Sequence, residues 1–234
     1  MTMAEDINYS TLLLQCEFDD RAPIRSRLRD VVLKRVPDGG RIVELGSGLG
    51  FNLDELSKRY QVLGVEGLGD AAARASRRGI ETIQANLEHG TGLETASFDA
   101  VLCLDVLEHL MDPASCIREA HRLLRSSGIF IVNVPNHFLL SYRIRMLFGE
   151  GLDAPRFFPT HDAWNYPHVR FFKSQSIQLA LTSNGFSVDE DLSSDFSAVP
   201  ILRKIRLLRG LCRFLGRSWP DLFCGGFFLV LRKD

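Results

Sequence analysis

The stretch Arg41-Ile42-Val43-Glu44-Leu45-Gly46-Ser47-Gly48-Leu49-Gly50 decides the fold. Its first half is a short apolar run that follows Pro37-Asp38-Gly39-Gly40, which predicts a β-strand that begins after a turn. The glycines at its end permit a sharp bend and let a ligand approach bare backbone. Residues 52–59 then predict a helix, whose first N–H groups would favour an anionic group. The stretch therefore predicts a ligand-binding turn between a strand and a helix.

The segments beyond this turn alternate short apolar runs with amphipathic stretches, the pattern of βαβ units around a parallel sheet. The expected strands are 41–45, 61–66, 80–85, 98–104 and 129–134. The expected helices between them are 52–59, 70–78 and 113–124, with Pro113 at the favoured first helical position. A further helix over 21–36 is expected to pack on the edge of this sheet.

The pattern changes after Pro135. Residues 137–148 look helical, whereas 149–167 are rich in Gly, Pro, Asp and aromatics and have no period, as in a long functional loop. A helix over 174–183 capped by Ser174, a strand from Phe186, a basic amphipathic helix over 201–215 and a closing strand over 226–231 are expected next. We interpret 1–234 as a single domain with an N-terminal helical cap at 1–40, a lid or substrate-binding insertion at 136–172 and a basic amphipathic helix at 199–217.

The composition of the 234-residue chain is that of an ordinary globular protein, with 45% hydrophobic and 24% charged residues. A formal net charge of -1 argues against nucleic acid as a partner. No apolar run approaches the roughly 20 residues that span a bilayer, and the acidic, polar start does not resemble a secretory signal. The five cysteines are scattered, which favours a reducing, cytoplasmic setting over a disulfide framework.

The glycine spacing bears on which ligand the turn binds. A dinucleotide fingerprint would place its third glycine at position 51, where this chain has Phe51. Glu66 ends the second strand, where a carboxylate can accept both hydroxyl hydrogens of a ribose. That position serves S-adenosylmethionine and NAD equally. The turn and Glu66 therefore predict a nucleoside-bearing ligand and leave both cofactors open.

Six segments, in this order and at this spacing, resemble the class I S-adenosylmethionine-dependent methyltransferases. They are Ile42-Val43-Glu44-Leu45-Gly46-Ser47-Gly48, Gly64-Val65-Glu66, Gln84-Ala85-Asn86-Leu87-Glu88, Phe98-Asp99-Ala100-Val101, Asp105-Val106-Leu107-Glu108-His109-Leu110 and Ser127-Gly128-Ile129-Phe130-Ile131-Val132. The match covers about residues 40–135 and continues loosely to 186. It implies an α/β, Rossmann-like three-layer sandwich with a seven-stranded, mostly parallel sheet whose last strand, near 227–231, is antiparallel.

The resemblance also implies S-adenosylmethionine as the cofactor and S-adenosylhomocysteine as its product. The cofactor-binding residues that it implies are Glu44, Gly46, Ser47, Gly48, Gly50, Glu66, Gly67, Asn86, Leu87, Leu104 and Asp105. Many members of the family carry Asp where this chain has Asn86. An amide offers both a donor and an acceptor, so it can still satisfy an adenine edge.

Narrower resemblances do not select one acceptor. Residues 105–112 resemble the ubiquinone-pathway O-methyltransferases, whereas 135–136 and 168–172 resemble methionine-biosynthesis methyltransferase-like proteins and sugar or polyketide methyltransferases. We expect a small-molecule acceptor, methylated most readily at oxygen. Two alternatives stay open: a cofactor-binding partner or regulatory subunit without turnover, and a nicotinamide-dependent oxidoreductase.

Histidines supply the candidate catalytic groups. Methyl transfer to oxygen benefits from a general base with a pKa near neutrality. The leading candidate is His109, just after the fourth strand, followed by His137 after the fifth strand and by His161 and His168 on the expected lid. Helical spacing would place Asp105 on one face with Glu108 or His109. Magnesium prefers more oxygen ligands than these provide, so we expect no metal.

The basic segment at 199–217 carries six Lys and Arg residues between positions 203 and 217 and no acid. The plain interpretation is a surface helix packed on the sheet. Docking of an anionic substrate, a carrier protein or an acidic membrane surface is the functional alternative.

Overall fold

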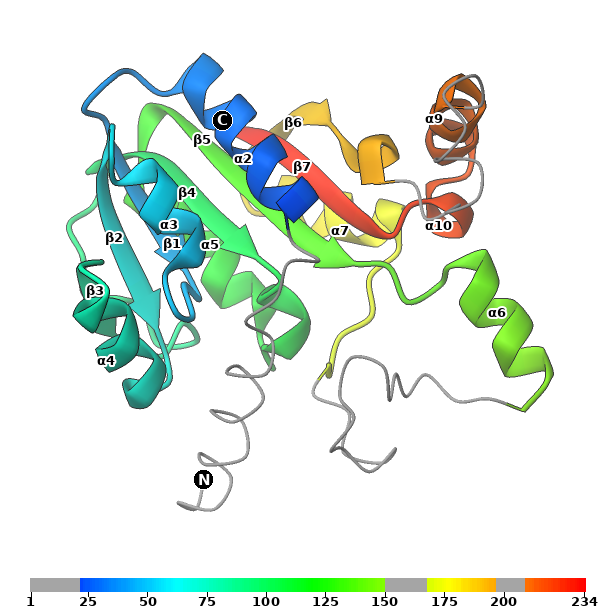
Figure 1. The fold of residues 1–234 in the computed structure, drawn as a ribbon, viewed down its shortest axis with the longest axis horizontal. Helices are drawn as coiled ribbons and strands as arrows, with labels where there is room; N and C mark the ends of the chain where they lie inside the picture. Colours follow the sequence, from blue (N-terminus) through cyan, green and yellow to red (C-terminus); the bar gives the residue numbers. More distant parts are fainter. Residues whose placement is uncertain (1–21, 150–167, 197–208) are drawn as a thin grey trace.

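The computed structural model describes residues 22–149, 168–196 and 209–234. A seven-stranded sheet in the order β3-β2-β1-β4-β5-β7-β6 lies at its centre, with helices on both sides (Figure 1). The strands are β1 (Arg41–Leu45), β2 (Gln61–Glu66), β3 (Thr82–Gln84), β4 (Phe98–Leu104), β5 (Leu124–Pro135), β6 (Phe186–Asp191) and β7 (Gly226–Lys233).

The sheet is mostly parallel, as predicted. β1 pairs in parallel with β2 and β4, and the parallel pairing continues to β3 on one side and to β5 on the other. β7 lies between β5 and β6 and is antiparallel to both, which confirms the prediction for the last strand. The carboxyl ends of β1, β2, β4 and β5 therefore meet at one edge of the sheet, where ligands bind in open α/β folds.

The helices alternate with the strands as expected, and most of them are shorter than predicted. They are α2 (Ala22–Arg35), α3 (Phe51–Leu56), α4 (Gly69–Arg77), α5 (Pro113–Leu123), α6 (Leu140–Leu147), α7 (Ser174–Thr182), α9 (Arg209–Ser218) and α10 (Pro220–Phe223), with 3-10 turns η2 (Leu107–His109) and η3 (Ser193–Phe196). Asp112 caps α5, because its side chain accepts a hydrogen bond from the N–H of Ala114. Pro113 takes the first helical position, as predicted.

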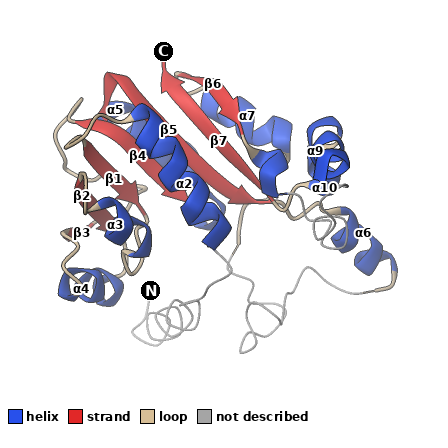
Figure 2. Ribbon diagram, turned by 45° about the horizontal axis from the view of Figure 1, so that its top comes forward, coloured by secondary structure: helices blue, strands red, loops and turns tan. Residues whose placement is uncertain are grey.

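Two apolar clusters, one on each face of the sheet, form the core. Alternate residues of β4 face opposite sides: Val101 packs in the cluster that includes residues of α5 and α7, and Leu102 packs in the cluster that includes residues of α2 and α3. Figure 2 shows α2 lying along the sheet. The expectation that this helix packs on the sheet edge was wrong, because Leu28 and Val32 are buried against residues of four strands on one face.

Three further expectations about element ends and packing were wrong. The helix α7 begins after Lys173, whose N–H donates to Ser176 Oγ, so Ser174 is the first helical residue and not the cap. β5 begins at Leu124, earlier than expected, and runs through Gly128 with a register shift against β4. The basic helix α9 packs mainly on η3 and α10, not on the sheet.

Some predicted features lie wholly or partly outside the described residues. These are positions 1–21 of the N-terminal cap, positions 150–167 of the expected lid with His161, and the first part of the basic helix, 199–208. No described helix is long and apolar enough to cross a membrane.

Candidate cofactor and acceptor site

The glycine turn, residues 46–50, has the backbone conformation that its glycines predict. Gly46, Gly48 and Gly50 all have positive φ, at 75, 54 and 78°. A Cβ on Gly46 would lie 2.4 Å from the Val106 side chain, so this glycine allows close packing against the end of β4. A Cβ on Gly48 would meet no atom within 4 Å. The turn is therefore closed by packing at Gly46 and open to a ligand at Gly48.

Glu66 joins this turn to the end of β2. Its Oε2 accepts a hydrogen bond of 2.8 Å from the N–H of Gly48, and its Oε1 accepts one of 2.9 Å from the N–H of Leu68. The side chain is buried. A carboxylate has about four lone-pair positions, so the two backbone bonds leave capacity for the two hydroxyl groups of a ribose. The arrangement fits the nucleoside role that was predicted for this residue.

The other polar residues of the first strand and turn are held by the protein itself. Glu44 is buried, and its Oε1 accepts a 2.6 Å hydrogen bond from Asn52 Nδ2 on α3. Ser47 is buried against β2, where its Oγ lies 2.5 Å from the place that a Cβ on Gly64 would take. The Ser47 side chain thus requires a glycine at position 64, and its buried Oγ has no hydrogen-bond partner among the described residues.

The expected adenine loop follows β3. Asn86 is exposed, and its Oδ1 accepts a 2.9 Å hydrogen bond from the N–H of Glu88, so the loop is a local turn. The Leu87 side chain packs in the core cluster beside α5. Gly67, at the end of β2, is tied to β3 because its carbonyl accepts from Gln84 Nε2. These contacts place Gly67 beside the end of β3, from which the 86–88 loop follows.

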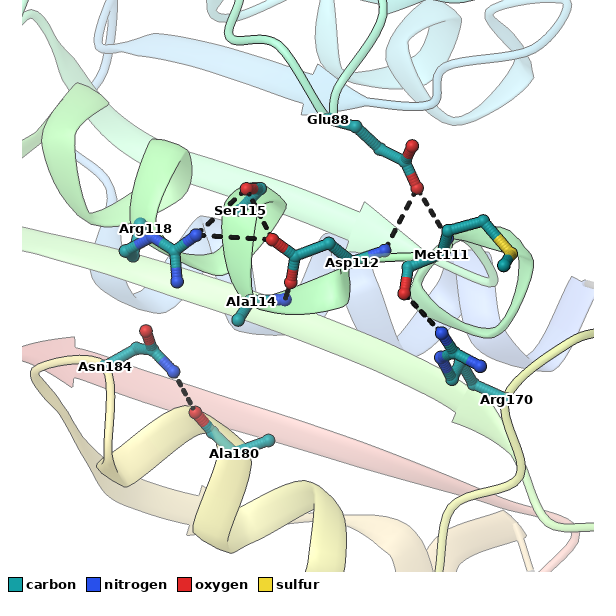
Figure 3. A network of polar contacts seen from close by, with 9 residues as sticks. All are labelled: Glu88, Met111, Asp112, Ala114, Ser115, Arg118, Arg170, Ala180 and Asn184. Atoms are coloured by element: carbon teal, nitrogen blue, oxygen red, sulfur yellow. Dashed lines mark hydrogen bonds and ion pairs between the residues drawn. The ribbon is translucent and has the colours of Figure 1, made fainter.

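Glu88 links this loop to the segment after η2 (Figure 3). Its Oε1 accepts hydrogen bonds from the N–H groups of Met111, at 2.5 Å, and Asp112, at 3.1 Å. The guanidinium of Arg170 donates to the carbonyl of Met111 from the other side. Residues 111–112 therefore connect the 86–88 loop to the segment around Arg170, although the three lie far apart in the sequence.

Asp105 occupies an unusual backbone position at the end of β4. Its φ is 56°, which is uncommon for a residue other than glycine. Its N–H donates to the carbonyl of Asn133, and its Oδ1 accepts a 2.5 Å hydrogen bond from Asn133 Nδ2. Leu104, just before it, is buried in the cluster beside α2 and α3. The carboxylate of Asp105 is thus fixed between the ends of β4 and β5.

The three histidines of the predicted catalytic set come together in space. His137 Nε2 and His168 Nδ1 lie 2.7 Å apart, in a hydrogen bond whose direction depends on the tautomers. The rings of His109 and His168 meet edge to face with centroids 4.6 Å apart. The N–H groups of Val169 and Arg170 both donate to the carbonyl of Glu108, which holds the 168–170 segment over η2. We refer to His109, His137 and His168 as the histidine cluster.

His137 is the most enclosed member of this cluster. Its side chain is buried and packs edge to face against Phe171 at 4.8 Å between ring centroids. Burial, and to a smaller extent the neighbouring His109, lowers the pKa of His137 to about 4. At neutral pH this imidazole is uncharged, so it suits an orienting hydrogen-bond partner of His168 better than a group that takes up a proton.

Comparison with known proteins places this geometry in a family. A family model described as a methyltransferase domain matches residues 43–132. A probable S-adenosylmethionine-dependent methyltransferase of Mycobacterium tuberculosis is 36% identical over 204 residues, which are 82% of this chain and 68% of the relative. The chain belongs to the S-adenosylmethionine-dependent methyltransferases. S-adenosylmethionine is therefore its cofactor, and the resemblance of the six segments is confirmed.

Other relatives match a smaller share of their length. A ubiquinone biosynthesis O-methyltransferase of Xylella fastidiosa is 28% identical over 130 residues, 52% of each chain. A probable S-adenosylmethionine-dependent methyltransferase of Mycolicibacterium smegmatis is 29% identical over 172 residues, and the match covers 60% of it. This methyltransferase thus spans between half and two thirds of the length of most of these relatives.

Solved structures agree with the fold. A methyltransferase of Mesorhizobium loti has a TM-score of 0.61 at 19% identity, covering 92% of this chain and 99% of the other. One of Thermotoga maritima, described as a possible histamine N-methyltransferase, has a TM-score of 0.56 at 24% identity, covering 79% and 81%. Both likenesses support the Rossmann-like sandwich of this methyltransferase.

Two asparagines beside the site of this methyltransferase were given no role by the sequence interpretation, although Asn136 was part of a segment that carried a resemblance. Asn133 and Asn136 are both buried at the end of β5. Asn136 Nδ2 lies within hydrogen-bonding distance of the carbonyls of Pro220, Asp221 and Cys224, and its Oδ1 accepts from the N–H of Phe138. The available signal was Asn133 itself, a polar residue within the apolar run 129–134. A buried amide at a strand end needs partners, and here those partners fix the backbone next to His137.

Replacing Asn136 by alanine is expected to lower the free energy of unfolding by about 2 kcal/mol, because buried carbonyls lose their donor. Urea unfolding followed by circular dichroism measures this. The matched control is Asn184→Ala in the turn after α7, where the half-buried side-chain amide donates to the Ala180 carbonyl (Figure 3). We expect a loss of no more than about 1 kcal/mol there. Equal losses of stability in the two variants would contradict the inference that Asn136 fixes the backbone next to His137.

The lowered pKa of His137 predicts a pH dependence of stability. Between about pH 6.5 and pH 4 the unfolded chain binds a proton at His137 that the folded methyltransferase does not bind. Stability is therefore full above pH 6.5 and falls as the pH drops toward 4, by on the order of 2–3 kcal/mol from this group. Urea midpoints across this range should fall less steeply in a His137→Asn variant. An unchanged slope in the folded His137→Asn variant would contradict the assignment to His137.

The predicted spacing of the acidic residues near His109 was wrong. Asp105 has positive φ and 107–109 form a 3-10 turn, so Asp105 shares no helical face with Glu108 or His109. Instead, ligand atoms of Glu108, His109 and His168 lie within 4.8 Å of one another, a spacing that a cation could bridge. Glu108 is buried, with its Oε1 4.0 Å from His109 Nε2.

Treatment with EDTA is expected to leave the initial rate of methyl transfer within twofold of the untreated rate. One carboxylate and two imidazoles supply fewer oxygen ligands than magnesium prefers, so we expect no requirement for magnesium and propose that the reaction needs no metal. The assay compares the rate before and after dialysis against the chelator. Loss of more than 90% of the rate, restored by one added divalent metal, would contradict it and assign Glu108, His109 and His168 as ligands.

Proposed function

We propose that this chain transfers the methyl group of S-adenosylmethionine to an oxygen of a small-molecule acceptor. The observation that carries the proposal is the convergence of His109, His137 and His168 beside the carboxyl ends of β4 and β5. These strand ends adjoin the glycine turn on β1, so a base and the cofactor would share one crevice. A ubiquinone biosynthesis O-methyltransferase among the relatives favours oxygen over nitrogen or carbon.

The cofactor would lie across the carboxyl edge of the sheet. Glu66 would accept the ribose hydroxyls, and the amide of Asn86 with the backbone of Leu87 would face the adenine. The methionyl carboxylate would lie over the glycine turn at Gly48, where a side chain would find open space. The sulfonium would then lie toward Leu104 and Asp105, at the end of β4. Glu44, Gly46, Ser47, Gly50 and Gly67 would shape the crevice around it.

When bound, S-adenosylmethionine would supply a methyl group on a sulfonium, to which the acceptor oxygen would bond as the sulfur–carbon bond breaks, leaving S-adenosylhomocysteine as a neutral thioether. The acceptor must lose its hydroxyl proton in this displacement. We assign His109 as the base that takes this proton. The Glu108 carboxylate, 4.0 Å from His109 Nε2, would stabilise the imidazolium that results. His168 would be held by its hydrogen bond to neutral His137, and it would position the acceptor through a hydrogen bond of its own.

The direct experiment is transfer of labelled methyl groups from the cofactor into fractionated cell metabolites. We expect the label to appear in a small-molecule fraction, in a product that is a methyl ether or a methyl ester. Binding of S-adenosylhomocysteine without labelling of any fraction would favour the alternative of a cofactor-binding partner subunit. Stabilisation of the protein against heat by NAD, and not by S-adenosylhomocysteine, would favour the oxidoreductase alternative.

The remaining predictions stay part of this proposal. We propose one methyltransferase domain over 1–234, with 136–172 as the lid over the acceptor; His137 and His168 lie in its described parts. The described cysteines, Cys103, Cys116, Cys212 and Cys224, are all free and buried, which supports the expected reducing, cytoplasmic setting. A small molecule, and not nucleic acid, remains the expected partner.

A further inference from the structure

Helix α6 presents an apolar stripe that the described chain does not cover. Leu140, Ile144, Leu147 and Phe148 recur at the spacing of one helical face, and no side chain of α6 is buried. The exposed fractions of Leu147 and Phe148 are 83% and 82%. In Figures 1 and 2 the helix stands away from the sheet, and among the described elements it contacts chiefly α10. A stripe of this kind is a feature of interaction sites.

Basic residues accompany the stripe, and α6 contains no acidic residue. Arg143 and Arg145 are exposed on the same helix. The neighbouring helix α9, which α10 joins to α6 at the same end of the molecule, likewise contains arginines and no acid. Its Phe214 and the following Trp219 are more than half exposed. Acidic residues lie here too, because α10 contains Asp221 and Arg213 of α9 pairs with Asp195. Among the described residues, the end of the molecule formed by α6, α9 and α10 still has more arginines than acids beside its exposed large apolar side chains, although the whole chain has a net charge of -1.

We propose that α6 lies on an anionic lipid surface, with its apolar stripe in the headgroup region and its positive charge facing the lipid phosphates. An eight-residue helix is about 12 Å long, which is too short to span a bilayer but sufficient for an interfacial helix. A large apolar face flanked by arginines, with tryptophan nearby, is the composition of such helices. A second copy of this chain fits less well, because a two-fold contact through α6 would bring arginine against arginine.

The attachment of α6 bears on what docking would do. The helix begins three residues after His137, and Leu139, between them, is buried. Asn136 fixes the preceding backbone to 220–224. Docking through α6 would therefore hold the histidine cluster close to the lipid surface, within reach of an acceptor that partitions into it. The docking itself does not depend on the proposed reaction.

The test is cosedimentation of the full chain with vesicles of phosphatidylcholine alone and of phosphatidylcholine mixed with phosphatidylglycerol. We expect binding to the mixed vesicles, at least tenfold weaker binding to neutral vesicles, and loss of binding as salt is raised. The double variant Leu147→Ser/Phe148→Ser should weaken binding to mixed vesicles at least tenfold. Leu179→Ser, an equally apolar and 64% exposed position on α7, is the matched control and should bind like the parent chain.

The charge is tested separately. Arg143→Gln/Arg145→Gln should reduce binding to mixed vesicles severalfold, whereas Arg77→Gln, an exposed arginine on α4, should not. Each variant is checked by circular dichroism and by binding of S-adenosylhomocysteine, which should be unchanged. Failure of the parent chain to sediment with mixed vesicles would overturn the proposal. So would a dimer in light scattering that the Leu147→Ser/Phe148→Ser variant abolishes, which would assign the stripe to a second copy.

Discussion

Replacing Glu66 by glutamine is expected to weaken the binding of S-adenosylhomocysteine about 100-fold. The carboxylate already accepts the N–H groups of Gly48 and Leu68, and the proposed ribose hydroxyls would use its remaining lone pairs. Glutamine replaces one acceptor oxygen with a donor, so it would lose both a backbone bond and a ribose bond. Hydrogen bonds to charged groups contribute about 1.5–3 kcal/mol each, and a loss of about 3 kcal/mol corresponds to about 100-fold. Isothermal titration calorimetry measures it.

Glu81→Gln provides the matched control for this variant. Glu81 is an exposed carboxylate directly before β3, at the end of that strand away from the proposed cofactor site. Its side chain faces no proposed ligand. We expect it to bind S-adenosylhomocysteine within twofold of the parent. If Glu66→Gln also binds within threefold while remaining folded, the ribose lies elsewhere and the assignment of Glu66 fails.

Replacing His109 by alanine is expected to lower kcat about 100- to 1,000-fold, because a positioned general base contributes about that factor. Binding of S-adenosylhomocysteine should change by less than threefold, since His109 is assigned to the acceptor and not to the cofactor. The measurement is the rate of labelled methyl transfer at saturating cofactor. Free imidazole added to the assay should restore part of the rate, because the truncated side chain leaves space beside His168.

His121→Ala is the control for His109→Ala. His121 lies on α5 and packs against Phe186 of β6, so its loss should leave kcat within twofold and give no response to imidazole. Unchanged turnover in His109→Ala would remove His109 as the base. A large loss in His168→Ala with full activity in His109→Ala would move the assignment to His168.

The central sheet could be predicted from the sequence because its strands are short apolar runs between turn residues. Phe98–Leu104 is buried on both faces, and an uninterrupted apolar run of this length is typical of such a strand. Glycine and proline mark the ends of the neighbouring elements, so the run could be read as one more strand of the same sheet. The glycine turn was predictable for the same reason, since only glycine adopts positive φ at three alternate positions without strain. The cofactor family followed from six segments in order, none of which is specific alone.

The details of the site could not be predicted because they depend on contacts between distant segments. The backbone of Asp105 is set by its hydrogen bonds to Asn133, 28 positions later, so helical spacing gave the wrong partners. Asn136 is fixed by carbonyls more than 80 residues away. The position of α2 on a face, and not on the edge, likewise follows from tertiary packing of Leu28 and Val32. The meeting of His109 and His168 belongs to the same class, because 59 residues separate them.

The place of β7 in the sheet has a consequence for biosynthesis. β6 is made first, but within the described sheet it pairs only with β7, which emerges from the ribosome more than thirty residues later. During that interval β5 and β6 both present open edges, the surfaces through which nascent chains misassociate. Completion of the sheet must therefore wait until the strand from Gly226 onward is translated, and chaperone demand should be greatest just before that strand inserts.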